Sequence, residues 1–584
     1  MISKISGKQL LYILLLFIFV LTIYLLFPLK CRLNYGHGQD ANENSWWLER
    51  DLCVYRLKDV LYPFLGVSFY KIWKIFGWQK GGMFPLQVIS AIFGAGGVII
   101  FFFLVKTIFR SKGMSFIASI FLAFSYAYWY FSIEATNTIP SLFFLFSAVL
   151  LLFRSPEDDV LKFPIYISIF HSMSMFIDVL SFLTVPAMAY GIFLFTKGKK
   201  RRKIIRALIY LITFGLISTS IHFYMGYRYF RIINLSGMFN QLTGHTVTEV
   251  NGNRLMLGLG TLFHSLFAIS HPDLISSNLY RLSQRINMVL LFIPAAGIPY
   301  VLFRIRKFQG YMVNIILFSL FWIIVPLPFY IHEEPTCLEY YVYLLPFIWL
   351  IILIAFWDIK RRLSSYKFQN ILIYSIVVIL AMFIIYNFSI GIRPKSEIKN
   401  NEAYKEYMFL KRHVNDKDLL IILEGSGSIG LALCYLDKNL EKLTEHIVFV
   451  DTFEALACYD SIAKRTKPDL PVYYEELCLK RNGESYYGPS FFEWLIKKAE
   501  NFDDIKICII PGKLWDKIAV DEAKNLKVSN IISDIAKITQ GLQRENELVQ
   551  KFLNIMSHNY TVELIPVEES FSLNSTLLSL SRRR

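Results

Sequence analysis

Residues 29–84 read LKCRLNYGHGQDANENSWWLERDLCVYRLKDVLYPFLGVSFYKIWKIFGWQKGGMF, and this stretch decides how the chain is organised. It follows one apolar run, residues 10–28, and precedes another that begins at Pro85. Carboxylates alternate here with tryptophans and tyrosines, so the stretch cannot cross hydrocarbon and is predicted to be a loop at a membrane surface. Its segments 52–66 and 67–78 mix apolar residues with lysines, a pattern typical of helices in the interface plane.

Composition independently indicates a membrane protein. The chain has 584 residues, of which 55% are hydrophobic and only 18% are charged, and its mean hydropathy is +0.44. A soluble protein of this length would not carry so apolar a surface. The net charge of +16 does not indicate nucleic acid, because the lysines and arginines cluster in short loops between apolar runs. None of the seven cysteines forms a CxxC pair, so neither a zinc site nor a thioredoxin-like motif is indicated.

The apolar runs predict about eleven transmembrane helices in a membrane domain of residues 1–388. Run 115–153 is too long for one span and is broken near Glu134, so it is predicted to be a hairpin with Glu134 at its outer tip. Run 163–195 is predicted to form two short helices. This count puts every short basic loop on the cytoplasmic side, together with the amino terminus. The predicted runs are 10–28, 85–109, 115–153, 163–195, 204–225, 286–303, 311–330, 340–357 and 371–386; the long outer loops are 29–84 and 226–285.

The two short helices of 163–195 carry polar residues that would be costly in lipid. Short helices do not reach full membrane depth, so we expect His171 and its polar neighbours to line a wet cavity. A packed, hydrogen-bonded histidine is the alternative interpretation. The polar neighbours are Ser172, Ser174, Asp178 and Ser181.

Residues 389–584 have a soluble composition and are predicted to form an extracytoplasmic α/β domain, since an odd number of spans precedes them. Segments 419–423, 447–450 and 505–510 favour strands, and 490–499 and 521–552 favour helices. A GxGxxG pattern, Gly425 to Gly430, follows the first strand, and Asp451 follows the second. The predicted location outside the cytoplasm argues against a nucleotide role, which stays open.

Four short stretches support a family resemblance. They are Asp40 after the first helix, LYPFLG at 61–66 followed by Tyr70, WYFSIEA at 129–135, and His171; the loop holding Glu333, Glu334, Pro335 and Glu339 adds to them. In these places the chain resembles the GT-C superfamily of integral-membrane glycosyltransferases, and most closely its protein O-mannosyltransferase-like members. Asp40-Ala41 stands where the family often has Asp-Glu. The resemblance covers the membrane part well and the tail poorly.

The resemblance implies transfer of a sugar from a polyprenyl-phosphate donor to a protein or to a glycan or lipid acceptor at the outer membrane face. Asp40 is expected to be the general base, with Glu43 as its nearest competitor, and Glu134 to orient the acceptor or the loop. Arginine forks suit the donor phosphate. No cofactor is indicated, a divalent cation stays open, and no nucleic-acid partner is expected. The residues expected to bind substrate are His171, Arg228, Arg231, Arg254 and Glu339.

Two other functions remain open at this stage. An oligosaccharide ligase or polymerase would use similar outer-loop arginines and histidines. A lipid or solute transporter would also be polytopic but should show repeated halves with broken helices, which the sequence lacks. In every case the protein is expected in the plasma or inner membrane, or in the endoplasmic reticulum if it is eukaryotic.

Overall fold

In the computed structural model the chain forms two compact units. One comprises Met1–Lys30 with Trp47–Glu397, and the other Cys31–Trp46 with Ile398–Arg584. Asp40, Glu43, Arg231, the GxGxxG stretch with Asp451, and the predicted helices 490–499 and 521–552 lie outside the described residues. Those described are 7–30, 48, 59–78, 81–154, 160–225, 227–228, 253–269, 277–363, 365–400, 419–423, 447–449, 504–509, 560–566 and 576–582.

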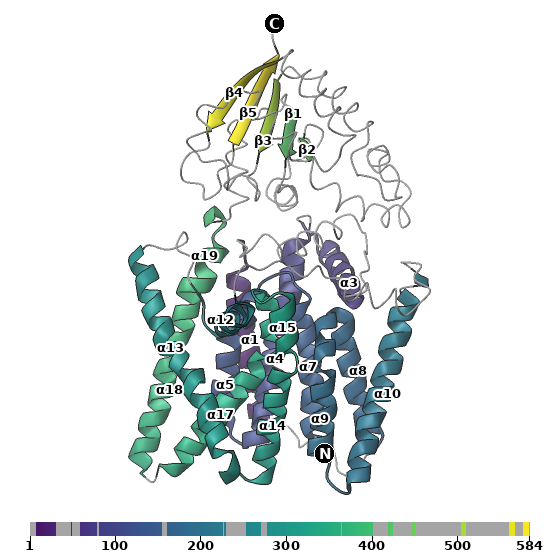
Figure 1. Cartoon of the computed structure of the whole chain (residues 1–584), viewed down its shortest axis with the longest axis vertical. Coiled ribbons are helices and arrows are strands. Elements are labelled where there is room, and N and C mark those ends of the chain that lie inside the picture. Colours follow the sequence, from purple (N-terminus) through teal and green to yellow (C-terminus); the bar gives the residue numbers. More distant parts are fainter. Residues whose placement is uncertain are drawn as a thin grey trace. The chain divides into compact units, whose positions relative to one another are not determined.

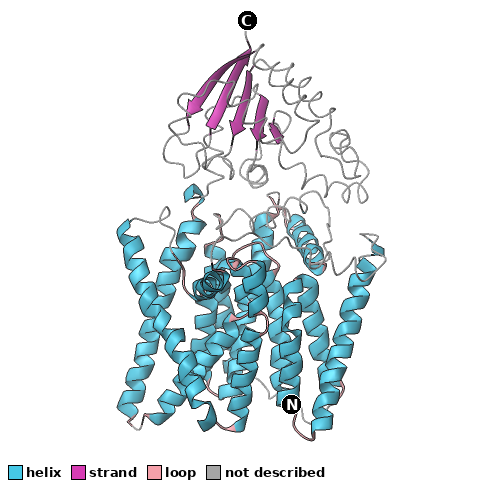
Figure 2. Cartoon of the chain, viewed as in Figure 1, coloured by secondary structure: helices cyan, strands magenta, loops and turns pink. Residues whose placement is uncertain are grey.

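The first unit is a bundle of helices (Figures 1 and 2). Its elements are α1 (Gly7–Leu26), α3 (Leu61–Ile75), α4 (Met83–Phe109), α5 (Lys112–Phe124), α6 (Tyr126–Ser132), α7 (Thr138–Arg154), α8 (Lys162–Ile177), η1 (Val179–Thr184), α9 (Val185–Phe195), α10 (Lys200–Met225), α12 (Arg254–Leu266), α13 (Ser277–Arg304), η4 (Ile305–Lys307), α14 (Gly310–Ile324), α15 (Leu327–Glu333), α16 (Leu338–Val342), α17 (Leu345–Arg362), α18 (Tyr366–Tyr386), η5 (Asn387–Ile392) and α19 (Arg393–Ser396).

Each apolar run of the sequence contains at least one of these helices. By length and composition, six of the described helical segments could cross a membrane, or seven if the bent pair α5–α6 counts as one span. The runs predicted to be broken are broken: 115–153 between α6 and α7, and 163–195 at Asp178. The interface segments differ from the prediction, because α3 continues through Gly66 instead of starting anew at Val67. A Cβ at Gly66 would lie 3.0 Å from the Leu86 side chain, so this glycine permits close packing rather than a break.

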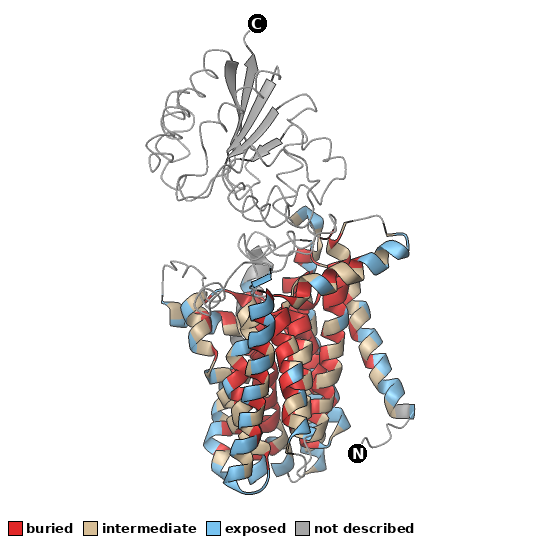
Figure 3. Cartoon of the chain, turned by 90° about the vertical axis from the view of Figure 1, so that its right-hand side faces the viewer, coloured by how far each residue is buried: buried red, intermediate tan, exposed pale blue. Residues whose placement is uncertain are grey.

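α4 lies at the centre of the bundle. It is buried along most of its length and packs against α1, α5 and α7. Two of its glycines allow α6 to approach: the Tyr128 hydroxyl donates to the Gly94 carbonyl at 2.9 Å, and a Cβ at Gly97 would collide with that hydroxyl. Figure 3 shows the buried residues gathered inside the bundle and the exposed ones on its outer faces, the distribution expected when lipid covers apolar helices.

The two ends of α4 define two ends of the bundle. Near its start, Ser90 donates to the Thr136 carbonyl at 3.2 Å, close to Glu134. At the carboxyl end of α4, Phe109 packs on Trp357 with 6.1 Å between ring centroids, and the Arg361 guanidinium lies 4.6 Å from the centroid of that tryptophan ring. A 27-residue helix is about 40 Å long, so the two ends are well separated. We call them the acidic end, which holds Glu134, and the basic end, which holds Arg361.

Asn387, the first residue of η5, connects three segments. Its amide nitrogen donates to the carbonyls of Phe124 at 2.8 Å and Leu266 at 3.0 Å, and its oxygen accepts from the Ala268 amide at 2.8 Å. The side chain is fully buried. It therefore satisfies backbone groups at the ends of α5 and α12 that have no water to bond.

The second unit contains a five-stranded sheet of order β2-β1-β3-β5-β4. Strands β1 (Leu419–Leu423), β2 (Ile447–Phe449) and β3 (Asp504–Ile509) are parallel and coincide with the three predicted strands. Strands β4 (Tyr560–Pro566) and β5 (Thr576–Arg582) pair antiparallel, with β5 also antiparallel to β3, and were not predicted. Parallel neighbours need long crossover connections, which fits the spacing of β1, β2 and β3 along the chain.

Candidate functional site

The bend between α5 and α6 directs the chain toward Glu134. The two helices meet at 68°, and Ser125 lies at the break. Its hydroxyl donates to the Phe121 carbonyl at 2.7 Å and accepts from the Trp349 indole nitrogen at 2.7 Å. Beyond the short α6, the Glu134 side chain is buried, with one carboxylate oxygen 3.2 Å from the Ala135 amide that donates to it. The predicted break in run 115–153 thus places a carboxylate at the acidic end.

Glu339 of α16 anchors the loop that carries Glu134. One of its carboxylate oxygens accepts from the Thr136 hydroxyl at 3.1 Å and also from the Thr138 hydroxyl. Two threonines that follow Glu134 are therefore tied to a residue about 200 positions later in the chain. Glu339 was predicted to bind substrate, and this stays a prediction; the structure shows that Glu339 holds this loop through the two threonines.

Asp178 is a third carboxylate fixed at this end of the bundle. It lies between α8 and η1, caps η1 by accepting from the Leu180 amide at 3.0 Å, and is 4% exposed. The Tyr343 hydroxyl donates to its other oxygen at 2.8 Å and lies 3.1 Å from the Ser141 hydroxyl. Asp178 at the start of η1 and Ser141 near the start of α7 are thus both joined to Tyr343, the residue that follows α16.

Burial, and after it the charge of Glu339, raises the pKa of Asp178 from 3.8 to about 7. The charge of Asp59 acts in the same direction, whereas hydrogen bonds from Leu180 and Tyr343 oppose it. Asp59, which precedes α3, is itself buried. Carboxylates from three distant parts of the sequence therefore influence one another here, and burial together with their charges favours the protonated form of Asp178.

The raised pKa predicts a specific pH dependence of stability. A carboxyl with a higher pKa in the folded state binds its proton more tightly there. Its contribution to the free energy of unfolding is therefore fully present below pH 3.8 and is lost as pH rises to about 7. Thermal unfolding of the detergent-purified protein should therefore show a falling midpoint across this window. Asp178→Asn is expected to flatten that slope, and an unchanged slope in the variant would contradict the assignment.

His171 is fully buried in α8 with both ring nitrogens engaged. Nε2 donates to the Ser181 carbonyl at 3.0 Å, which leaves Nδ1 to accept from the Tyr210 hydroxyl at 2.7 Å. The Thr184 hydroxyl lies 3.1 Å from Nε2. These contacts correspond to the packed, hydrogen-bonded interpretation considered from the sequence. A substrate contact by His171 stays a prediction and would require one of these partners to be exchanged.

Two of the three arginines predicted to bind the donor are described. Arg228 is exposed just beyond α10. Arg254 begins α12, and its guanidinium donates to the His332 carbonyl at the end of α15, in the loop that leads to Glu339. Their role as phosphate ligands stays a prediction. Within the described residues no group of three or more His, Cys, Asp or Glu side chains could hold a metal ion, and a divalent cation remains untested.

Sequence reasoning singled out Glu134 and Glu339 but did not recognise Asp178, Asp59 and Tyr343 as one site. Asp178 was identified only as a polar residue lining a wet cavity. The signal that could have found it is an aspartate followed by an apolar helix start, the pattern of an N-cap. No local signal pointed to Tyr343, which lies 165 residues from its partner Asp178.

Comparison with known proteins relates this helical bundle, with its buried carboxylates at one end, to one family model. Residues 67–224 match the family model described as dolichyl-phosphate-mannose-protein mannosyltransferase. This segment runs from within α3 to α10 and includes Glu134, His171 and Asp178. The resemblance to GT-C glycosyltransferases noted from the sequence is confirmed in this respect.

Among the solved structures that the chain resembles are two of ArnT from Cupriavidus metallidurans. The apo state matches with a TM-score of 0.56 at 10% identity, covering 98% of each chain. The form bound to undecaprenyl phosphate matches with a TM-score of 0.47 at 10% identity, again covering 98% of each chain. The first match shows that this protein has an ArnT-like fold. A search of curated protein sequences found no match.

Proposed function

We propose that the protein transfers a sugar from a polyprenyl-phosphate donor to a hydroxyl of a protein or of a glycan or lipid acceptor at the membrane surface. The observation that carries this proposal is the mannosyltransferase family match, because the matched segment contains the helices that hold Glu134 and Asp178. The ArnT-like fold supports the same class of reaction. A lipid-linked donor would also explain why the carboxylates lie at the acidic end of the bundle, where the apolar helices end.

The chemistry requires a base, a stabilised leaving group and a fixed acceptor. In the proposed reaction Asp40 takes the proton of the acceptor hydroxyl, whose oxygen bonds to C1 of the sugar. The bond from C1 to the phosphate oxygen breaks, and the polyprenyl phosphate leaves with the electron pair. Arginine forks of residues 226–285 neutralise that phosphate. Glu134 orients the acceptor, and Glu339 holds the loop that carries Glu134.

The proposed topology has about eleven membrane crossings, with the acidic end and an α/β domain of residues 389–584 outside the cytoplasm. It is supported by the gathering of Arg361 and its aromatic neighbours at the opposite end, since basic loops favour the cytoplasmic side. The parallel strands β1, β2 and β3 support the α/β assignment of the tail.

Purified protein in detergent should release labelled sugar from a radiolabelled polyprenyl-phosphate sugar and attach it to an acceptor. In the same assay Arg228→Ala or Arg254→Ala is expected to raise the apparent donor requirement while changing maximal turnover little, because a phosphate ligand is lost. Lys399→Ala, which removes a cation outside these loops, serves as the control.

Absence of any sugar transfer, with donor moved intact across a vesicle membrane, would identify a transporter instead. Transfer of whole oligosaccharides in preference to single sugars would identify a ligase. Unaltered donor kinetics in the five single variants of the segment would remove the proposed role of the outer arginines without affecting the reaction class; the five are Arg228, Arg231, Arg254, Arg281 and Arg285.

A further inference from the structure

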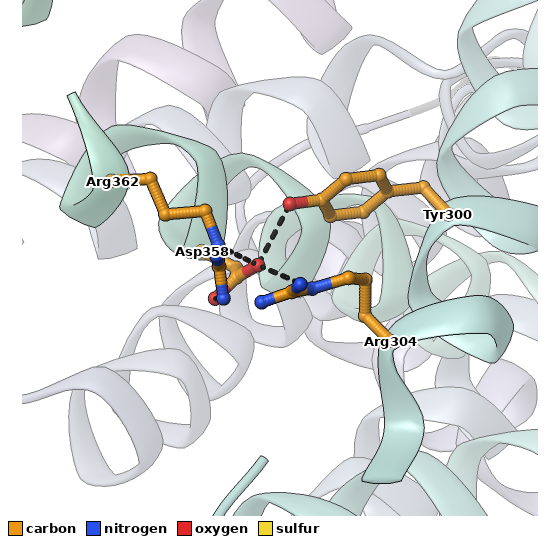
Figure 4. Close-up of polar contacts among 4 residues, drawn as sticks. All are labelled: Tyr300, Arg304, Asp358 and Arg362. Carbon is orange, nitrogen blue, oxygen red and sulfur yellow. Dashed lines mark hydrogen bonds and ion pairs between the residues drawn. The ribbon is translucent and has the colours of Figure 1, made fainter. Parts of the chain in front are cut away.

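A cluster of charged residues at the basic end of the bundle lies far from the proposed reaction. Asp358 of α17 accepts from the Tyr300 hydroxyl at 2.7 Å and from Arg362 Nε at 2.9 Å (Figure 4). Arg304, the last residue of α13, forms an ion pair with the same oxygen, Nε to Oδ2 3.6 Å. One carboxylate oxygen thus faces two guanidinium groups and a hydroxyl.

Arg304 is the unusual member of this cluster. It is 9% exposed, and both Nε and Nη2 are buried without a hydrogen-bond partner among the described residues. The distance of 3.6 Å to Asp358 is an ion pair but too long for a good hydrogen bond. A buried guanidinium with unused N–H groups is costly unless an acceptor is supplied. Arg304 therefore offers N–H groups and a positive charge to an acceptor.

The charge balance around the cluster favours an anion. Asp358 alone opposes Arg304 and Arg362, so the cluster keeps one positive charge. Both arginines stand at the carboxyl ends of their helices. Further basic residues lie close to them in the sequence: Arg306 and Lys307 of η4, and Lys360 and Arg361 of α17.

The surface beside Arg304 is apolar. The two residues before it, Leu302 and Phe303, are 44% and 85% exposed, and Phe292, farther back on α13, is 71% exposed. In a bundle that lies in a membrane, such a surface faces acyl chains. A phosphate held by Arg304 would therefore lie at the carboxyl end of α13, next to the part of this helix that faces acyl chains. This position suits a lipid head group better than a free ion.

We propose that Arg304 and Arg362 bind the phosphate of an anionic two-chain phospholipid, with its acyl chains along α13. Asp358, which accepts from Tyr300, competes with the phosphate for the two guanidinium groups. The site is independent of the sugar-transfer reaction and would connect α13 to α17 through the lipid as well as through Asp358.

Native mass spectrometry of the full chain, released from nanodiscs of equal phosphatidylglycerol and phosphatidylcholine, measures this preference directly. The wild type should retain phosphatidylglycerol selectively, and Arg304→Gln should lower the ratio of retained lipids roughly 10-fold, the usual scale for hydrogen bonds to a charged group. Arg306→Gln removes the same charge from an exposed position in η4 and should leave the ratio unchanged. Asp358→Asn should raise the ratio, because both arginines lose their competing carboxylate.

Three results would overturn the proposal: no selectivity in the wild type, equal losses in Arg304→Gln and Arg306→Gln, or a lower ratio in Asp358→Asn. Inorganic phosphate added at millimolar concentration tests the other source of the same chemistry. Displacement of the lipid by phosphate alone would show a free-anion site and overturn the lipid assignment, whereas persistence supports it. The wild-type and phosphate measurements remain decisive even if Arg304→Gln fails to fold.

Discussion

Replacing Asp40 with Asn is expected to lower sugar transfer by about 10²-fold to 10⁴-fold, the range lost when a general base is removed. The substitution keeps size and hydrogen bonding but abolishes proton acceptance, so folding and donor binding should survive. Initial rates with saturating labelled donor measure the effect, and thermal unfolding checks the fold. Asp40 lies outside the described residues, so its role rests on its place after α1 and on the family resemblance.

Glu43→Gln is the matched control, because it neutralises a carboxylate three residues further along the same loop. It should retain most of the turnover. If Glu43→Gln abolishes transfer while Asp40→Asn does not, the base is Glu43. If both variants remain active, neither carboxylate is the base and the proposed mechanism is wrong.

Replacing Glu339 with Ala is expected to lower turnover by about 10²-fold, because loss of orientation at a reacting group has effects of this size. The carboxylate anchors Thr136 and Thr138, so its removal releases the loop that holds Glu134. Donor affinity should change little, so the effect should appear in kcat rather than in the KM for donor. Glu333→Ala, which removes a carboxylate earlier in the same loop, is the control.

A double-mutant cycle separates positioning from direct contact. If Glu339 acts through the threonines, Thr138→Val should also lower turnover, and combining it with Glu339→Ala should add little further loss. Glu134→Gln should lower turnover as well, since it alters the residue that the loop presents. Fully additive effects of Thr138→Val and Glu339→Ala would show that Glu339 acts on substrate independently of this loop.

The sequence predicted what depends on local composition. Apolar runs located the helices, and the polar interval between Ser132 and Pro140 located the turn that carries Glu134. The sequence could not predict pairings across the bundle: Thr138 meets Glu339, and Asp178 meets Tyr343, only because the chain around α16 folds back to the starts of α7 and η1. At Gly66 the prediction was wrong: this glycine was interpreted as a helix boundary, but α3 continues through it and its missing side chain permits close packing against Leu86.

Asn387 bears on the order in which the protein can be assembled. Its carbonyl partner Phe124 is 263 residues earlier in the chain, and the Leu266 carbonyl is 121 residues earlier. While the chain is being made, these groups have no amide to bond until synthesis has passed Asn387. Unpaired backbone groups in hydrocarbon cost several kcal/mol each. We therefore expect the ends of α5 and α12 to be completed only after α18 has been made, which delivers Asn387 to them.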